Sequence, residues 1–453
     1  MGFFVVSRKV GERLLSDNVS MCINQSMWSA LWQVIVFGAV TVCPGKVLGD
    51  ESFLGAMTLS QAEKRALVAN TDILSSRLLI KSAEADVVVA SELANPQLSI
   101  GTTGANLKQG IGSAWQWNKS VDSVMRLDQQ IERGNKRGIR VNVAKKGVMA
   151  AELDASDMLR TVKQQVDLAY YNLKYAQEMV GSYNRLLLLQ TNLLDAARLQ
   201  YQYGGASEID VTRIKTEVGR ARSDVARAEL TMRNAQIGLA KLLGDAGDST
   251  RLVAVDDWPY PVKVDTAQIE KRLDERPDVI AAHARLEQAQ LSIELARAQR
   301  TRDVGVGLQY EHNMTGTTAP NAWSIGVSVP LFLLSKYEGE IQRAVADRNV
   351  AEESLKHIKT SAEAELQQAM AEVNNSLIRL NNYKSDVLDQ ARTAAEAAEY
   401  AYHRGALNLT DLLDARRAWQ SLIIDMLDAQ NDYAGALADW RAATASNSEA
   451  PVQ

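Results

Sequence analysis

The sequence predicts a mainly α-helical protein with a small β part, built as a tandem repeat of long helical hairpins. From residue 340 to residue 404, the 453-residue chain contains neither glycine nor proline. At 1.5 Å per residue, this stretch allows a helix of roughly 100 Å. Each half of the chain also contains short segments in which apolar and polar residues alternate, as they do in β-strands.

The first residues differ from the rest, and residues 1–49 are interpreted as a secretory signal peptide. An uncharged apolar run at residues 27–40 follows three basic residues, as in export signals. An amino-terminal membrane anchor and lipidation at Cys43 are the alternatives, although the run is short for a span of about 20 residues. Because Cys22 and Cys43 both lie in this segment, cleavage after Gly49 would leave a mature chain without a thiol.

The chain repeats itself after this leader. The segment ARLQYQYG at residues 197–204 matches AEYAYHRG at 398–405, and Asp210 and Asp411 follow at the same offset. Such self-similarity indicates a tandem duplication of about 200 residues. The predicted domains are a first repeat at 50–245, a linker or equatorial segment at 246–265, a second repeat at 266–443 and a flexible tail at 444–453.

The two repeats are predicted to contain the same elements in the same order. Each begins with an alanine-rich helix, continues through one strand, a polar loop and a second strand, and then enters a very long helix that ends at a glycine. A second helix then returns along the first. The expected helices are 59–94, 148–203 and 209–243 in the first repeat, and 266–300, 340–404 and 410–443 in the second.

The alternating segments have the pattern of transmembrane β-strands, with one apolar and one polar or glycine-rich face. In the first repeat, Leu98 and Ile100 show this pattern, and a weaker one extends from Val121 to Leu127. The residues of the second repeat that are predicted to face lipid are Val304, Val306, Leu308, Tyr310, Ile325, Val327 and Val329. The predicted membrane-interface aromatics are Trp115, Trp117 and Trp323, since tryptophan favours that position.

Four strands are too few to enclose a water-filled pore, and an open sheet edge is not tolerated in lipid. Three copies of the chain would supply twelve strands, the smallest pooling expected to leave a pore instead of a packed interior. The sequence therefore predicts four transmembrane strands per protomer in a shared 12-stranded β-barrel.

Composition excludes several function classes. The net charge of -5 is distributed over interspersed acids and bases, whereas a nucleic-acid groove requires a basic surface. The sequence has no phosphate-binding loop, nucleophile elbow or dinucleotide fingerprint, so we expect no enzyme, no catalytic residues and no cofactor. Four histidines are scattered without ligand spacing, and no metal site is predicted. The remaining hypotheses are a trimeric conduit and a soluble periplasmic coiled-coil scaffold.

Several motifs together resemble the TolC-type outer-membrane efflux family, and more narrowly its heavy-metal, CzcC-like branch. The resemblance covers residues 59–443 and depends on the duplication and on three segments: ERPDV at 275–279, VPLF at 329–332, and YHRG at 402–405 followed by DLLDA at 411–415. The first repeat departs from the family at QQIE, residues 129–132, where a proline-containing strand end is usual. The Arg276-Pro277-Asp278 segment also has a local explanation as a helix start.

The resemblance implies a homotrimer in the outer membrane of a Gram-negative bacterium, with a trimeric α-barrel extending through the periplasm. It implies passive conduction towards the exterior, with a periplasmic adaptor and an inner-membrane RND-type pump as partners. It favours divalent metal cations as substrates, and organic compounds are the alternative.

The resemblance also places a gate at the hairpin ends. Asp411 and Asp414 are three residues apart and share a helical face, and matching acids narrow the pore in the family. The alternative for Asp411 is a helix cap. Tyr402 and Asp210 match positions that form a closing link between the hairpins, and Arg404 is a second candidate for that link.

Overall fold

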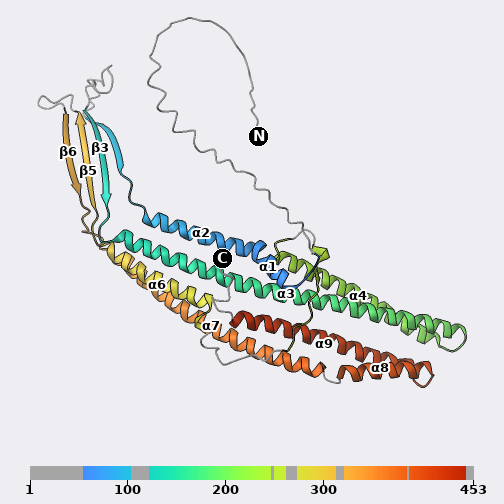
Figure 1. Ribbon diagram of the computed structural model, residues 1–453. Coiled ribbons are helices and arrows are strands. Elements are labelled where there is room, and N and C mark those ends of the chain that lie inside the picture. Colours follow the sequence, from blue (N-terminus) through green and yellow to red (C-terminus); the bar gives the residue numbers. More distant parts are fainter. Residues whose placement is uncertain are drawn as a thin grey trace, which may run out of the picture. The chain divides into compact units, whose positions relative to one another are not determined.

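The computed structural model describes residues 55–103, 122–245, 249–261, 273–312, 321–384 and 387–444. Within these ranges the chain is mainly helical with a small β part, which confirms the predicted fold class (Figure 1). The elements in chain order are β1 (Ala56–Met57), α1 (Leu59–Ala69), α2 (Thr71–Ser91), β2 (Gln97–Thr103), β3 (Asp122–Ile131), α3 (Lys136–Gln202), α4 (Glu208–Leu242), the 3-10 helix η2 (Ser249–Arg251), β4 (Val253–Ala254), α6 (Pro277–Ala298), β5 (Val304–His312), β6 (Asn321–Ser328), α7 (Glu338–Lys384), α8 (Val387–His403) and α9 (Leu409–Thr444).

The expected helix at 59–94 is divided into α1 and α2 at Asn70. This residue has an extended backbone, and its side-chain oxygen accepts hydrogen bonds from the backbone nitrogens of Asp72 and Ile73. Its side-chain nitrogen donates to the carbonyl oxygen of Leu242 at 2.9 Å. Asn70 therefore caps the start of α2 and also binds the last residue of α4, two roles that favour a break at this position.

The second repeat has a corresponding junction around Arg276, which is 1 % exposed. Its guanidinium donates two bonds to Asp278, one to Glu365 of α7 at 2.9 Å, and one to the carbonyl oxygen of Ala443 near the end of α9. The two junctions therefore correspond. Asn70 precedes α2, the helix that leads to β2, and binds the end of α4. Arg276 precedes α6, the helix that leads to β5, and binds the end of α9. The Arg276-Pro277-Asp278 segment starts α6, as its local explanation required. Arg276 also joins α6 to α7 and α9.

Helix α3 is longer than expected, because it begins at Lys136 and not near residue 148. The additional turns contain Gly138 and Gly147, although glycine is unfavourable inside a helix. A Cβ at Gly147 would lie 3.0 Å from the side-chain nitrogen of Gln288 in α6, so glycine allows these two helices to approach closely. At 67 residues, α3 connects the sheet to the first hairpin end.

Both hairpins end with the same turn. Gly204 and Gly405 have φ angles of 76° and 72°, a region that strongly favours glycine. In the first hairpin, the nitrogen of Gly205 donates to the carbonyl of Gln200 at 2.8 Å. In the second, Ala406 donates to Ala401 at 2.9 Å. The equal offset of these pairs gives structural support to the sequence duplication.

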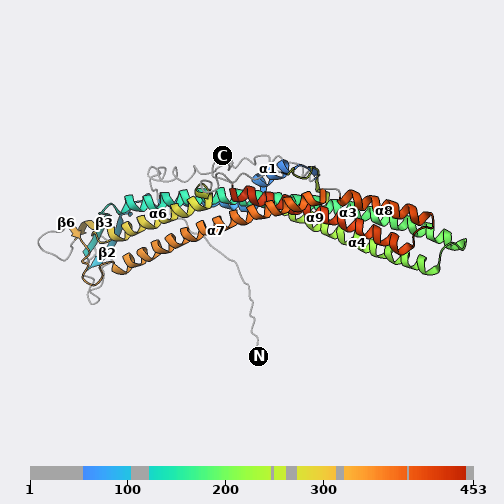
Figure 2. The same ribbon diagram turned by 90° about the horizontal axis from the view of Figure 1, so that it is seen from below.

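Buried apolar residues form separate clusters along the helices. The largest cluster gathers side chains from α1, α3, α4, α9 and the short parallel pair β1–β4. The hydroxyl of Tyr170 lies within it, donates to the carbonyl of Met57 at 3.1 Å and accepts from the nitrogens of Val255 and Asp256. The two hairpins lie side by side beyond this point (Figure 2), and a second cluster fills the space between them near their ends.

Candidate functional site: the sheet and the hairpin ends

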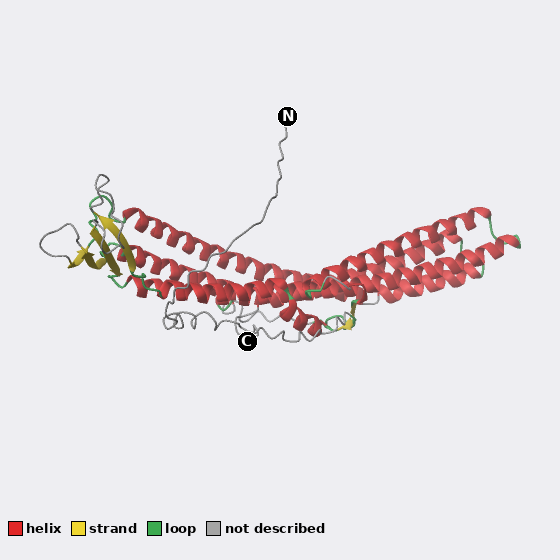
Figure 3. Ribbon diagram, turned by 90° about the horizontal axis from the view of Figure 1, so that it is seen from above, coloured by secondary structure: helices red, strands yellow, loops and turns green. Residues whose placement is uncertain are grey.

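Strands β2, β3, β5 and β6 form one antiparallel sheet in that order. The sheet lies where α2 and α6 end and α3 and α7 begin, whereas the hairpin turns lie at the opposite ends of the helices (Figure 3). Strand β3 continues through residues 129–131, so the departure from the family pattern does not end the strand early. Val329 lies just beyond β6, which ends at Ser328. Trp115 and Trp117 fall outside the described residues.

One face of the sheet is apolar across all four strands. The register aligns Leu98, Leu127, Leu308 and Ile325 in one row, and Ile100, Met125, Tyr310 and Trp323 in the next. These side chains are largely exposed, reaching 79 % for Ile325 and 69 % for Trp323. No element among the described residues covers these two apolar rows, and an exposed patch of this kind indicates contact with an apolar environment or partner.

Polar groups mark the end of this apolar face that is farther from the helices. The rings of Tyr310 and Trp323 lie 4.9 Å apart, centre to centre. The Tyr310 hydroxyl donates to the side-chain oxygen of Asn321 at 2.9 Å, and a ring nitrogen of His312 lies 2.6 Å from the same oxygen. An apolar band that ends in tyrosine, tryptophan and hydrogen-bonded polar side chains is typical of a membrane–water interface.

The opposite face of the sheet is polar and carries an ion pair. Arg126 donates from Nε to Asp128 Oδ2 at 2.7 Å, and its Nη1 lies 3.4 Å from Gln309 Oε1 on β5. A Cβ at Gly307 would lie 2.4 Å from Asp128 Oδ1 and 2.7 Å from Arg126 Nη2. Sequence reasoning missed this pair, although the spacing of Arg126 and Asp128 by two in a strand could have placed both on one face.

The hairpin ends bring Asp210 and Asp411 to equivalent positions. Each is the third residue of a returning helix, and each donates its backbone nitrogen to the capping side chain, Ser207 for Asp210 and Asn408 for Asp411. The cap of α9 is therefore Asn408 and not Asp411. Both aspartate carboxylates lie in the first turn of a helix, where negative charge is favoured.

Asp414 is one turn further along α9, and it is already paired. Arg417 donates from Nη1 to Asp414 at 3.1 Å and from Nη2 to Glu217 of the other hairpin at 2.6 Å. Glu217 also accepts from Arg220 at 3.3 Å, and its side chain is only 14 % exposed. Sequence reasoning did not single out Arg417 or Glu217, because they are 200 residues apart and only the packing of the hairpins joins them.

Two residues of the predicted closing link, Tyr402 and Asp210, lie near one another within the chain. Tyr402 packs against the apolar cluster between the hairpins, and burial followed by the charge of Asp210 raises the pKa of its hydroxyl. The Asp210 carboxylate accepts from the Ser207 hydroxyl at 2.7 Å. Arg404 lies over the ring of Tyr400, 5.2 Å from its centre. The closing link stays a prediction, since it concerns the assembled protein.

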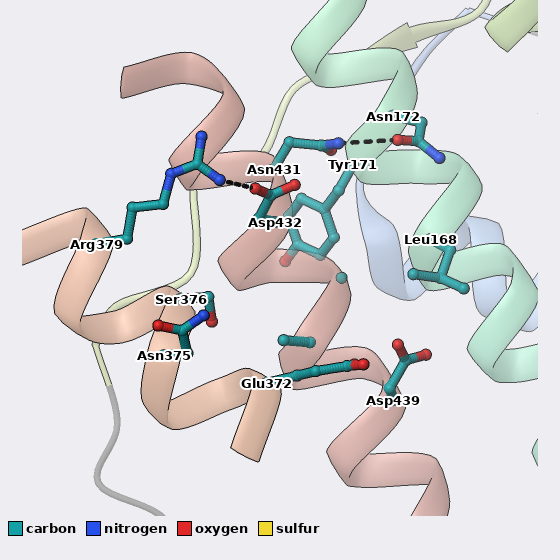
Figure 4. A pocket seen from close by; sticks show the side chains of 12 residues that line it. Leu168, Tyr171, Asn172, Glu372, Asn375, Ser376, Arg379, Asn431, Asp432 and Asp439 are labelled. Carbon is teal, nitrogen blue, oxygen red and sulfur yellow. Dashed lines mark hydrogen bonds and ion pairs between the residues drawn. The ribbon is translucent and has the colours of Figure 1, made fainter. Parts of the chain in front are cut away.

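A pocket of about 370 Å³ opens between α3, α7 and α9 (Figure 4). Four of its polar side chains pair with one another: Asn431 donates to Asn172 at 3.0 Å, and Arg379 pairs with Asp432. Among the residues that the structure describes, no group of three or more histidine, cysteine, aspartate or glutamate residues could hold a metal ion. In the same part of the chain, no helix is both long and apolar enough to cross a membrane.

Comparison with known proteins decides the family. The sequence matches the family described as outer membrane efflux protein over residues 63–245 and again over residues 269–446. The chain belongs to the outer membrane efflux protein family. It is therefore an outer-membrane protein of the class that forms the channels of tripartite efflux systems, and not a soluble scaffold.

Individual relatives agree with this assignment. The cobalt-zinc-cadmium resistance protein CzcC of Cupriavidus metallidurans is 23 % identical over 391 residues, covering 86 % of this chain and 89 % of the relative. The pyoverdine export outer membrane protein OpmQ of Pseudomonas putida is 22 % identical, with 83 % and 84 % covered. The solved structure of CusC has a TM-score of 0.72 at 17 % identity and covers 86 % of this chain and 92 % of that one. The resemblance to TolC-type channels, including CzcC, is thereby confirmed.

Proposed function

We propose that three copies of this chain form a passive exit duct of a tripartite efflux system. The observation that carries the proposal is the strand order. Neighbouring strands run antiparallel in the order β2-β3-β5-β6, so the edge strands β2 and β6 run in opposite directions. β6 of one copy can therefore pair with β2 of the next in the antiparallel sense, and three sheets close into twelve strands without an open edge.

In this arrangement, the rows centred on Leu308 and Tyr310 contact lipid, and the polar face with Arg126 and Asp128 lines the water-filled lumen. The helices extend from the barrel through the periplasm as a trimeric α-barrel. The duct has no catalytic residues and needs no cofactor, because an RND-type pump in the inner membrane supplies the driving force.

We place the gate at the hairpin ends, where the periplasmic adaptor and the pump would meet the duct. Threefold symmetry would repeat Asp411 and Asp414 as rings of carboxylates, which favour cations and repel one another. Because Arg417 binds Asp414 within the chain, Asp411 carries more of the uncompensated charge. Tyr402, Asp210 and Arg404 would hold the two hairpins together in the closed state.

Divalent metal cations are the proposed substrates. Support comes from CzcC, whose name assigns it to resistance against cobalt, zinc and cadmium, at 89 % coverage of that protein. The alternative is an organic compound, because OpmQ is a pyoverdine export protein and is almost as similar. An acidic gate suits cations, which favours the first candidate.

The test uses a Gram-negative host that lacks its own metal-efflux outer-membrane channel and expresses this chain with a matched adaptor and pump. We expect lower cellular zinc, cobalt and cadmium than in cells with the empty vector. A variant that cannot insert in the membrane serves as the negative control. Unchanged metal content together with lower pyoverdine retention would contradict the metal assignment and support the organic one. Unchanged content of both would contradict the duct.

A further inference from the structure

In the part of the sheet that the structure describes, the polar face contains a single cation among four ionisable side chains. Directly opposite residues of neighbouring strands share a face, and the register places Asp122, Arg126, Asp128 and Glu311 on this side. Among the described residues of β2, β3, β5 and β6, Arg126 is the only lysine or arginine. Among these four side chains only Arg126 is positively charged at neutral pH, so its charge strongly affects how acidic the face is.

Arg126 lies flat across two neighbouring strands. A Cβ at Gly307 on β5 would lie 2.7 Å from its Nη2 atom, and a Cβ at Gly326 on β6 would lie 3.6 Å from the same atom. The guanidinium thus extends over two positions without side chains. Asp128 fixes one side of it at 2.7 Å, and Gln309 lies 3.4 Å from Nη1.

The close approach of the Arg126 guanidinium is specific to Gly307 and Gly326. Gly101 lies on the same polar face, in β2, and a Cβ added there would meet nothing within 4 Å. At Gly307, by contrast, a Cβ would collide with both members of the ion pair. Gly101 therefore serves as a control for Gly307, because it lies on the same face but has no ion pair above it.

We propose that the Arg126–Asp128 pair, lying flat over Gly307 and Gly326, is an ion-selectivity element of the β-barrel lumen, separate from the hairpin ends. This inference rests on the proposed function, because it requires the polar face to line a conduit. Held flat, Arg126 neutralises Asp128 and stays away from the pore axis, so that the carboxylate of Glu311 on the same face can attract cations. A charge ring of this kind sets which ions enter a pore.

The test measures reversal potentials of the purified detergent-solubilised protein in planar bilayers under a potassium chloride gradient. Arg126→Gln removes the cation and is expected to raise the cation-to-anion permeability ratio about twofold, the effect of one unit charge about 8 Å from the ion in water. Asp128→Asn leaves Arg126 without its partner and is expected to lower the ratio by about the same factor. The double variant has the original net charge and is expected to return towards the wild-type ratio.

The glycine pair tests the geometry. Gly307→Ala should displace the guanidinium towards the lumen and lower the single-channel conductance, whereas Gly101→Ala should leave it unchanged. If wild type conducts but both single charge variants keep its ratio, the selectivity element is wrong while the duct stands. If wild type forms no channel, the proposed function fails and this inference fails with it. If Arg126→Gln fails to assemble, the permeability ratio of Asp128→Asn and the conductances of the two glycine variants test the proposal instead.

Discussion

Replacing Ile325 by lysine should prevent insertion of the protein in the outer membrane. Ile325 lies near the middle of β6, directly opposite Leu308, in the row that continues through Leu127 to Leu98. A lysine on the lipid-facing side near the bilayer midplane costs about 2–4 kcal/mol. If three copies share one barrel, the cost is roughly 6–12 kcal/mol, which is comparable with the whole stability of a typical domain.

The neighbouring residue supplies a matched control. Ser324 lies on the opposite face, across from Gln309, so Ser324→Lys adds the same charge on the side proposed to contact water. We expect Ile325→Lys to be depleted from the outer-membrane fraction and to lack the oligomer band on unheated gels, while Ser324→Lys resembles wild type. Equal insertion of the two variants, or equal failure of both, would refute the assignment of the faces.

Three further predictions concern the helices. Arg276→Gln leaves two carboxylates without their buried cation and should lower the unfolding free energy by about 2–4 kcal/mol. Lys359→Gln, at an exposed ion pair, should lower it by less than about 1 kcal/mol. Calorimetry of the purified protein compares the two variants, and equal losses would contradict the role of Arg276. Burial, followed by a neighbouring glutamate, raises the pKa of Asp167 to about 7, above the value of about 3.9 in an unfolded chain. The folded state therefore binds the extra proton, so stability should fall as pH rises from about 4 to about 7, and melting curves of Asp167→Asn should lack this part of the fall. Asp411→Asn should reduce cation preference in bilayer recordings more than Asp414→Asn does, because Arg417 already pairs with Asp414; the reverse order would place the gate charge elsewhere.

The regular features of the fold were predictable because short-range rules determine them. A glycine with a positive φ follows α3 at Gly204 and α8 at Gly405, and alternation in β5 and β6 correctly separates the apolar and polar faces. The duplication was visible because the two hairpin ends keep the same spacing of residues.

Other features depend on contacts that the sequence alone does not reveal. The break at Asn70 is favoured by its bond to Leu242, 172 residues away, and Gly147 is tolerated in α3 because α6 approaches it. The bond between Arg417 and Glu217 likewise requires the two hairpins to lie together. At the sheet, alternation identified the faces, but only the register shows that Arg126 reaches over Gly307.

We expect this chain to assemble into a trimeric, water-filled conduit. A planar-bilayer recording of the detergent-purified protein, with the mass of the complex determined in the same preparation, tests it most directly. We predict a trimer with a small, cation-favouring conductance. A monomeric species, or a trimer that does not conduct under any applied voltage or pH at which it remains assembled, would contradict the account.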